Sequence, residues 1–335
     1  MAKSVMDRGS IKRYSNEAVF DELRKIYGGA YDKYRNDWET AGKLQVKEER
    51  PSHLLMELTS HCNMLCKMCY RNYVPERVEG YMKMEIVDKI VCEAKALKVP
   101  SIFLGAGSEC LLHPEITLIL KKFAEVGAMD YWMISNGSLL THEISEAIID
   151  AQLTVFSVSL DAATPETYEK IRGNGGKYNL ETVTRNIMEL INLRERKNKM
   201  FPRIRLSYVV MDENEHEVER FKKQWDEYVD MFDFQALTDY ALYEKIIEDV
   251  SIEEDYHCPD PFSRIVINYK GDMHPCVSNF YRPEEPVNIQ DMSIKEYWYS
   301  SAIEALRVAV KNRAFPKSCT RCVAARLAME NTKKW

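Results

Sequence analysis

Three cysteines within eight residues are the part of this sequence with the clearest chemical potential. Cys62, Cys66 and Cys69 are spaced C-x3-C-x2-C and directly follow the strand-like run 54–59. A cubane [4Fe–4S] cluster prefers a cysteine on each of its four irons, so three thiolates leave one iron open for a substrate or cofactor. The spacing differs from the paired C-x2-C of a zinc ribbon, and three clustered thiols cannot pair among themselves as disulfides.

This motif at the end of a first strand resembles the signature of the radical S-adenosylmethionine (SAM) superfamily. The resemblance implies that the open iron chelates the amino and carboxylate groups of SAM. The reduced cluster then cleaves SAM to methionine and a 5′-deoxyadenosyl radical. The residue before the third cysteine is usually aromatic and lies near the adenine. Here it is Met68, whose thioether can also pack against a ring.

Other positions match the family's SAM-binding motifs. Gly107, Ser108 and Glu109 follow the second expected strand and resemble the glycine-glycine-glutamate loop that holds the SAM amino group. Glycine lets the backbone approach a ligand closely, and an acidic side chain can bind an ammonium. Ser159 at the end of the fourth expected strand and Arg172 after it match the serine and arginine that meet the ribose and the carboxylate of SAM.

Four neighbouring features have less definite roles. Residues 135–137 (Ser-Asn-Gly) end the third expected strand, either as a plain turn or to present an amide. Asp161 is expected to cap the following helix or to shape its loop. Cys110 is a candidate hydrogen-atom donor to a substrate radical, with an inert packed thiol as the alternative. Cys92 lies in an expected helix, where we predict a buried position.

Composition and charge narrow the class of protein. The chain has 335 residues and a net charge of −6, so no basic footprint suggests nucleic-acid binding. No apolar run approaches the roughly 18 residues of a membrane span, and the N-terminus lacks a signal-like apolar core. The nine cysteines are clustered, which fits metal ligation in a reducing compartment. We therefore expect a cytoplasmic protein that binds neither nucleic acid nor membrane.

Strand-like and helical patterns alternate regularly from Pro51 to about Leu237, which predicts an α/β fold with a parallel sheet and helices outside it. Eight βα units would close a full barrel. Six fit the partial (β/α)6 barrel that the radical SAM resemblance implies, with functional groups at the C-terminal ends of the strands. The expected strands are 54–60, 101–105, 131–135, 155–160, 204–210 and 232–237, and the expected helices are 84–98, 114–127, 141–150, 165–196 and 213–230.

Residues 1–50 are expected to form an N-terminal helical extension of two short helices that separate at residues 28–29 (Gly-Gly). Tyr27, Tyr31, Tyr34 and Trp38 share one face at helical spacing. We predict that this face packs against the main domain, with a partner- or substrate-binding lid as the alternative. The segment is shorter than the leader-binding domain that many peptide-modifying relatives carry here.

A second cysteine group lies towards the C-terminus, in the region 241–335 that follows the expected barrel domain 51–240. Its members are Cys258, Cys276, Cys319 and Cys322. Residues 265–276 are typical of a β-hairpin, and residues 293–312 of an amphipathic helix. Four cysteines suit tetrahedral zinc or an iron–sulfur cluster equally well by ligand count.

The order of hairpin, G-x4-C, helix and C-x2-C resembles the auxiliary-cluster domain called SPASM, in its single-cluster or twitch form. The resemblance implies one auxiliary [4Fe–4S] cluster held by these four cysteines. A cluster ligated at every iron suits electron transfer better than substrate binding.

The two resemblances imply a radical SAM oxidoreductase. We expect it to abstract hydrogen from a small polar metabolite, such as a sugar, amino sugar or aminocyclitol, with net oxidation. Its expected electron donor is a flavodoxin- or ferredoxin-type protein. One alternative is a maturase that oxidises, epimerises or cross-links a ribosomal peptide. The other is a zinc-stabilised binding protein without radical chemistry.

Overall fold

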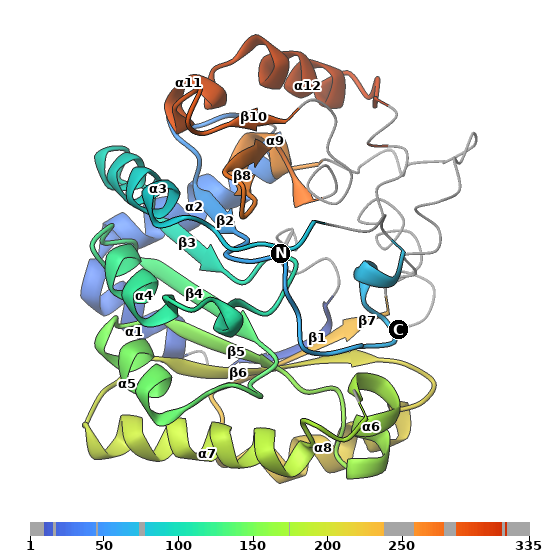
Figure 1. Cartoon of the computed structure of the whole chain (residues 1–335). Coiled ribbons are helices and arrows are strands. Elements are labelled where there is room, and N and C mark those ends of the chain that lie inside the picture. The colour runs from blue at the N-terminus through green and yellow to red at the C-terminus, as the bar shows by residue number, and fades with distance from the viewer. Residues whose placement is uncertain are drawn as a thin grey trace.

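The structure, a computed structural model, describes residues 10–15, 18–44, 46–73, 78–173, 175–237, 258–277, 286–316 and 319. Six parallel strands pair in chain order at the centre of this described part (Figure 1). Each begins within one residue of its expected start, which confirms the α/β partial barrel. They are β2 (His53–Met56), β3 (Ser101–Leu104), β4 (Asp130–Ser135), β5 (Val155–Ser159), β6 (Arg203–Val210) and β7 (Met231–Ala236).

Helices cover the outer face of this sheet (Figure 1). The apolar residues of the strands and the inner helix faces form one buried core, typical of a parallel sheet covered by helices. The predicted helix 165–196 is in fact two helices, α6 and α7, because the intervening chain carries Gly175 and Gly176 at positive φ. The helices are α3 (Met84–Ala96), α4 (Ile116–Ala124), α5 (His142–Asp150), α6 (Pro165–Arg172), α7 (Leu180–Arg196) and α8 (Val218–Trp225).

Two N-terminal helices, α1 (Ala18–Tyr27) and α2 (Gly29–Leu44), separate at Gly28 as predicted. Tyr34 of α2 is buried and donates a hydrogen bond of 2.8 Å to Asp130 Oδ2, at the start of β4. Trp38 meets the ring of His53, at the start of β2, edge-on at 5.0 Å between ring centroids. The prediction that this face packs on the main domain is confirmed for Tyr31, Tyr34 and Trp38 but was wrong for Tyr27, which is exposed. A substrate-binding lid does not fit, because α2 lies at the N-terminal ends of the strands, and partner binding by this segment stays a prediction.

Both edges of the sheet extend beyond the six strands. β1 (Ser10–Ser15), which the sequence did not predict, pairs antiparallel with β7. At the other edge β8 (Arg264–Ile267) pairs parallel with β2 and antiparallel with β9 (Asp272–His274), so the predicted hairpin is confirmed and continues the barrel sheet. β10 (Val287–Asn288) completes this edge.

The C-terminal part adds the short helix α9 (Asp260–Ser263), then α11 (Ile294–Trp298) and α12 (Ser301–Lys311). The predicted helix 293–312 is therefore interrupted, and Ser300 caps the second piece by accepting a hydrogen bond from the Ile303 amide. The domain boundaries at residues 50 and 240 stay predictions. No helix in the described residues has the length and apolarity needed to cross a membrane.

Candidate active site

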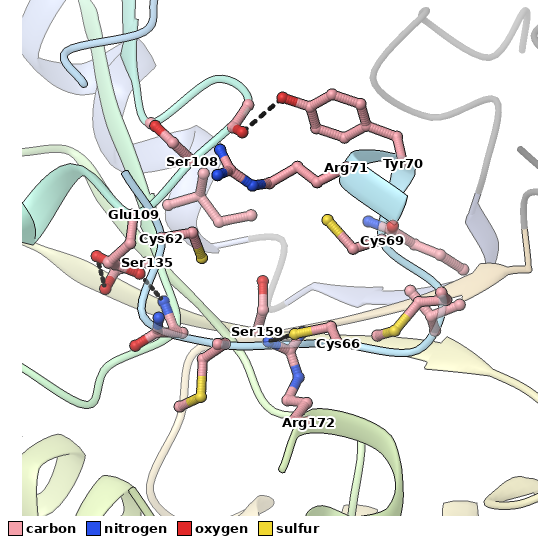
Figure 2. A pocket seen from close by; sticks show the side chains of 18 of the residues that line it. Cys62, Cys66, Cys69, Tyr70, Arg71, Ser108, Glu109, Ser135, Ser159 and Arg172 are labelled. Atoms are coloured by element: carbon pink, nitrogen blue, oxygen red, sulfur yellow. Dashed lines mark hydrogen bonds between the residues drawn. The ribbon is translucent and has the colours of Figure 1, made fainter. Parts of the chain in front are cut away.

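A cavity of about 320 Å³ lies at the C-terminal ends of the strands. The cysteine loop after β2 supplies one side, and the ends of β3 to β7 and of α6 supply the rest (Figure 2). The structure brings together in its lining every residue that the sequence assigned to the first cluster or to SAM. These are Cys62, Cys66, Met68, Cys69, Gly107, Ser108, Glu109, Ser159 and Arg172.

The three cysteine side chains point into the same central space of the cavity (Figure 2). Burial raises the pKa of all three thiols, that of Cys66 to about 11 in spite of the nearby Arg172 guanidinium. A cationic metal centre between them would offset this cost, because metal ligation deprotonates a thiol. No three His, Cys, Asp or Glu side chains in the described residues are arranged to hold one metal ion. A cubane takes one thiolate per iron, so the donor set fits it.

Glu109 is a buried carboxylate at the cavity wall, with 2% of its surface exposed. It accepts hydrogen bonds from Ser135 Oγ (2.7 Å), the Asn136 amide (2.7 Å) and the Leu111 amide (3.1 Å). Burial raises the pKa of the Glu109 carboxyl even though these three hydrogen bonds lower it. An ammonium group in the cavity would stabilise the ionised form.

The loop before Glu109 needs glycine. Gly105 has a φ of +106°, and a Cβ there would stand 2.5 Å from the Ile134 carbonyl oxygen. Gly107 also has positive φ, and its carbonyl accepts a 2.6 Å hydrogen bond from the Tyr70 hydroxyl. The Ser108 hydroxyl donates to the Thr59 carbonyl. These contacts fasten the loop to the chain on both sides of the cysteine motif, so the loop can keep its backbone against the cavity.

Arg172 and Asp161 form an ion pair in which both side chains are buried, 6% and 1% exposed. Arg172 Nε donates to Asp161 Oδ2 at 2.6 Å, and the Val209 amide donates to Asp161 Oδ1 at 2.6 Å. Thr164, not Asp161, caps α6, so of the two predicted roles Asp161 has only the second, in its loop. Its carboxylate holds the Arg172 guanidinium at the cavity, where Arg172 Nη1 lies 3.6 Å from Cys66 Sγ.

Sequence reasoning missed a second set of contacts at the cysteine loop. Asn136 Nδ2 donates to Asn63 Oδ1 at 2.8 Å, and Asn63 Nδ2 donates to Ser138 Oγ at 2.9 Å. The Asn136 backbone also binds Glu109, so one residue joins the cysteine loop to the buried carboxylate. The Ser-Asn-Gly sequence at the end of the third expected strand was the signal in the sequence that could have indicated these contacts. Asn136 lies at that strand end and presents its side-chain amide to Asn63.

Two other cysteines lie away from the cavity lining. Cys110 is fully buried, and its Sγ donates to the Ile134 carbonyl at 3.1 Å. Burial raises the pKa of this thiol well above its usual value. This placement suits the packed-thiol alternative better than a hydrogen-atom donor. Cys92 is exposed, so the prediction that it is buried was wrong.

The structure describes only part of the distal cysteine group. Cys258, Cys276 and Cys319 are each partly buried. Cys258 precedes α9, and Cys276 follows β9 by two residues. Cys322 lies outside the described residues. Joint ligation by these four cysteines therefore stays a prediction.

Two sequence families match the chain in succession. The radical SAM superfamily matches residues 56–224, and SPASM, an iron–sulfur cluster-binding domain, matches residues 258–323. The two matches include all seven cysteines that the sequence assigned to clusters. They confirm both resemblances on which the sequence interpretation was built.

Two curated relatives match this chain at 32% and 28% identity, over stretches of different length. The GTP 3′,8-cyclase of Microcystis aeruginosa is 32% identical over 133 residues, 37% of this chain and 39% of that protein. The probable GTP 3′,8-cyclase of Methanothermobacter thermautotrophicus is 28% identical over 284 residues, 83% of each protein. This chain thus spans well under half of the first relative.

Solved structures share the fold. SuiB of Streptococcus suis bound to its precursor peptide SuiA has a TM-score of 0.60 at 14% identity, covering 89% of this chain and 75% of that chain. BtrN in complex with AdoMet and 2-DOIA has a TM-score of 0.52 at 15% identity, covering 81% of this chain and 92% of that chain. At these identities the likeness is one of fold.

Proposed function

This chain belongs to the radical SAM superfamily and carries a SAM-bound [4Fe–4S] cluster and an auxiliary iron–sulfur cluster; from that premise we propose that it oxidises a small polar metabolite. The observation that supports the chemistry most directly is the convergence of three cysteines, Glu109 and Arg172 on one cavity. When bound, the cluster and SAM supply a 5′-deoxyadenosyl radical that takes a hydrogen atom from an unactivated C–H bond.

The cavity residues have distinct proposed roles. Cys62, Cys66 and Cys69 ligate the cluster that binds SAM. Glu109 binds the SAM ammonium and Arg172 its carboxylate, since each side chain is buried, charged and part of the lining. The remaining SAM contacts are Met68 at the adenine, Ser159 at the ribose, and the backbone of Gly107 and Ser108 beside the amino group.

The distal cysteines Cys258, Cys276, Cys319 and Cys322 are proposed to hold the auxiliary [4Fe–4S] cluster. The iron–sulfur character of the matched domain supports iron over zinc. Closed ligation suits electron transfer. A cluster held by these four cysteines would accept one electron from the substrate after hydrogen abstraction, so that hydrogen abstraction, electron loss and release of a proton to solvent would together amount to a net two-electron oxidation. The proposed electron donor for the first cluster is a flavodoxin- or ferredoxin-type protein.

Arg71 and Arg172 are the two basic side chains in the described lining, and Arg172 is paired with Asp161. The activity named for the cyclase relatives is not proposed for this chain, because the match to the Microcystis aeruginosa protein covers only 39% of that protein. Peptide modification is the second candidate, because the precursor-bound SuiB structure has this fold.

The fate of the substrate radical tests the proposed function. Holoenzyme, SAM and dithionite are incubated in deuterated water with sugars, amino sugars, aminocyclitols or a ribosomal peptide, and products are weighed by mass spectrometry. We expect a sugar-like product that has lost two hydrogens. Cys276→Ala, which removes a proposed auxiliary ligand, should stop product formation yet permit some SAM cleavage. Incorporation of one solvent deuterium at an unexchangeable carbon would instead indicate epimerisation, and a modified peptide would favour the second candidate.

Glu109→Gln separates a SAM contact from simple packing. The substitution keeps the shape of the side chain and removes the charge that faces the SAM ammonium. SAM binding should weaken about 10- to 150-fold, the equivalent of the roughly 1.5–3 kcal/mol of a charged hydrogen bond, with iron content unchanged. Titration of SAM against the holoenzyme measures this.

The pH dependence of SAM affinity gives Glu109→Gln a second readout. Because burial raises the Glu109 pKa and SAM binds the ionised carboxylate, wild-type affinity should be complete above that pKa and fall as the pH falls through it. The part of the pH profile that Glu109 contributes should vanish in Glu109→Gln. Equal SAM affinity in the two proteins would contradict the assignment.

A further inference from the structure

Gln235, near the end of β7, lines the cavity but has no place in the binding of the cluster or of SAM. Its Nε2 donates a hydrogen bond of 2.9 Å to Asp233 Oδ2, two residues earlier on the same strand. No donor in the described residues forms a recorded hydrogen bond with Gln235 Oε1. The amide therefore has one end fixed by the protein and one end available at the cavity.

A buried charged network fixes the orientation of this amide. Asp233 is fully buried and pairs with Arg205, whose Nη1 lies 3.2 Å from Asp233 Oδ2. Arg205 in turn donates from Nε to Ser157 Oγ at 2.9 Å, and its guanidinium lies 5.1 Å from the Trp132 ring centroid. A carboxylate paired with an arginine only accepts hydrogen bonds. Gln235 must therefore turn its NH₂ group towards Asp233 and its carbonyl oxygen away from it.

A buried ion pair often stabilises a fold no more than packed hydrophobic residues would, so stability alone does not account for this network. Its residues lie on β5, β6 and β7, where they form a polar wall beside the cavity. On β4, Ile134 lines the cavity and packs with Leu55, Phe103 and Val266 in an apolar cluster. One cavity thus combines an apolar surface with a fixed hydrogen-bond acceptor.

We propose that Gln235 is a specificity-determining residue whose carbonyl oxygen accepts a hydrogen bond from a hydroxyl or amino group of a small ring substrate. A cyclic polyol or amino sugar has both surfaces that this cavity matches, an apolar C–H face and donor groups at its edge. Asp233 and Arg205 act as positioning residues, because they reach the substrate only through Gln235. This inference rests on the proposed function and names the substrate group that the site recognises.

The experiment measures binding apart from turnover. Holoenzyme with SAM and without reductant is titrated with millimolar myo-inositol and glucosamine, followed by saturation-transfer NMR. Gln235→Leu keeps the approximate size of the side chain and removes the acceptor, and it should weaken binding of the better probe about tenfold, as for one lost hydrogen bond. Gln235→Asn draws the amide back from the cavity and should also weaken binding of the better probe. Gln224→Leu is the matched control, because Gln224 binds the Ala163 carbonyl outside the cavity.

A deoxy analogue of the better probe identifies the contact. Removal of the recognised hydroxyl should cost the wild type about tenfold and cost Gln235→Leu nothing further. Iron content and SAM affinity should match the wild type in every variant. If the Gln235→Leu protein differs from the wild type in either property, the binding measured for Gln235→Asn tests the proposal instead.

Each result decides between the two proposals. Dithionite is then added to the same samples to start turnover. Probe binding that depends on Gln235, with no hydrogen then transferred from the probe to deoxyadenosine, supports the acceptor role and overturns the proposed oxidation. Oxidation of a polyol with unchanged binding in both Gln235 variants overturns the acceptor role alone. Failure of both probes to bind the wild-type holoenzyme also overturns the inference, because the named substrate class would then be wrong.

Discussion

Replacing Cys62, Cys66 and Cys69 together by alanine is expected to abolish reductive SAM cleavage and to remove half of the protein's iron. The seven cysteines in two groups predict about eight irons per chain, from two cubanes. The three thiols of the first group meet at one cavity, and no other cysteine among the described residues lines it, since Cys110 Sγ is buried against the Ile134 carbonyl. Iron and sulfide analysis of anaerobically purified protein, with 5′-deoxyadenosine assayed after dithionite and SAM, measures both effects.

Cys92→Ala is the matched control for this experiment. Cys92 is exposed on α3, so its removal should change neither iron content nor SAM cleavage. Cys110→Ala tests the remaining thiol and should retain product formation. Full iron content in the triple variant would contradict the ligand assignment, and zinc in place of half the iron would contradict the auxiliary cluster.

Asp161→Asn is expected to destabilise the protein more than Arg172→Met, although the two residues form one ion pair. Loss of Asp161 leaves a buried guanidinium that cannot lose its proton and that keeps, among the described residues, only Cys66 Sγ, at 3.6 Å, as a nearby partner; loss of one partner of a buried ion pair costs about 3–5 kcal/mol. Loss of Arg172 leaves a carboxyl that still accepts from the Val209 amide and can take up a proton. Both variants should bind SAM weakly, because each loses the positioned guanidinium.

The pH dependence of stability gives a second readout for the pair. Burial already raises the Asp161 pKa in the presence of Arg172, and removal of the cation should raise it further. A carboxyl whose folded pKa lies above its unfolded value stabilises the protein at low pH and loses that contribution as the pH rises. The stability deficit of Arg172→Met should therefore shrink on acidification, whereas that of Asp161→Asn should persist.

Thermal unfolding of the anaerobic holoproteins at several pH values measures these differences. Asp37→Asn, which breaks the exposed pair of Lys33 and Asp37 on α2, is the control and should have little effect. Equal destabilisation by Asp161→Asn and Arg172→Met at every pH would show that the buried charge is not the cause.

Local sequence was sufficient for the cysteine motif and for the succession of elements. The spacing of Cys62, Cys66 and Cys69 lies within one loop, so their proximity follows from chain length alone. The six βα units follow from hydrophobic periodicity and glycine positions, which act over a few residues. Parallel strands then share a C-terminal edge, and that rule brought Glu109, Ser159 and Arg172 to the same end of the sheet as the cysteines.

The tertiary structure alone decided which groups hydrogen-bond to the site residues and which side chains face the cavity from each strand. Glu109 depends on Ser135 and the Asn136 amide from the next strand, and the orientation of Gln235 depends on Arg205 from a neighbouring strand. The parallel pairing of β8 with β2 joins residues more than 200 positions apart. Such contacts depend on strand order, register and burial, whereas periodicity specifies only which face of an element is apolar.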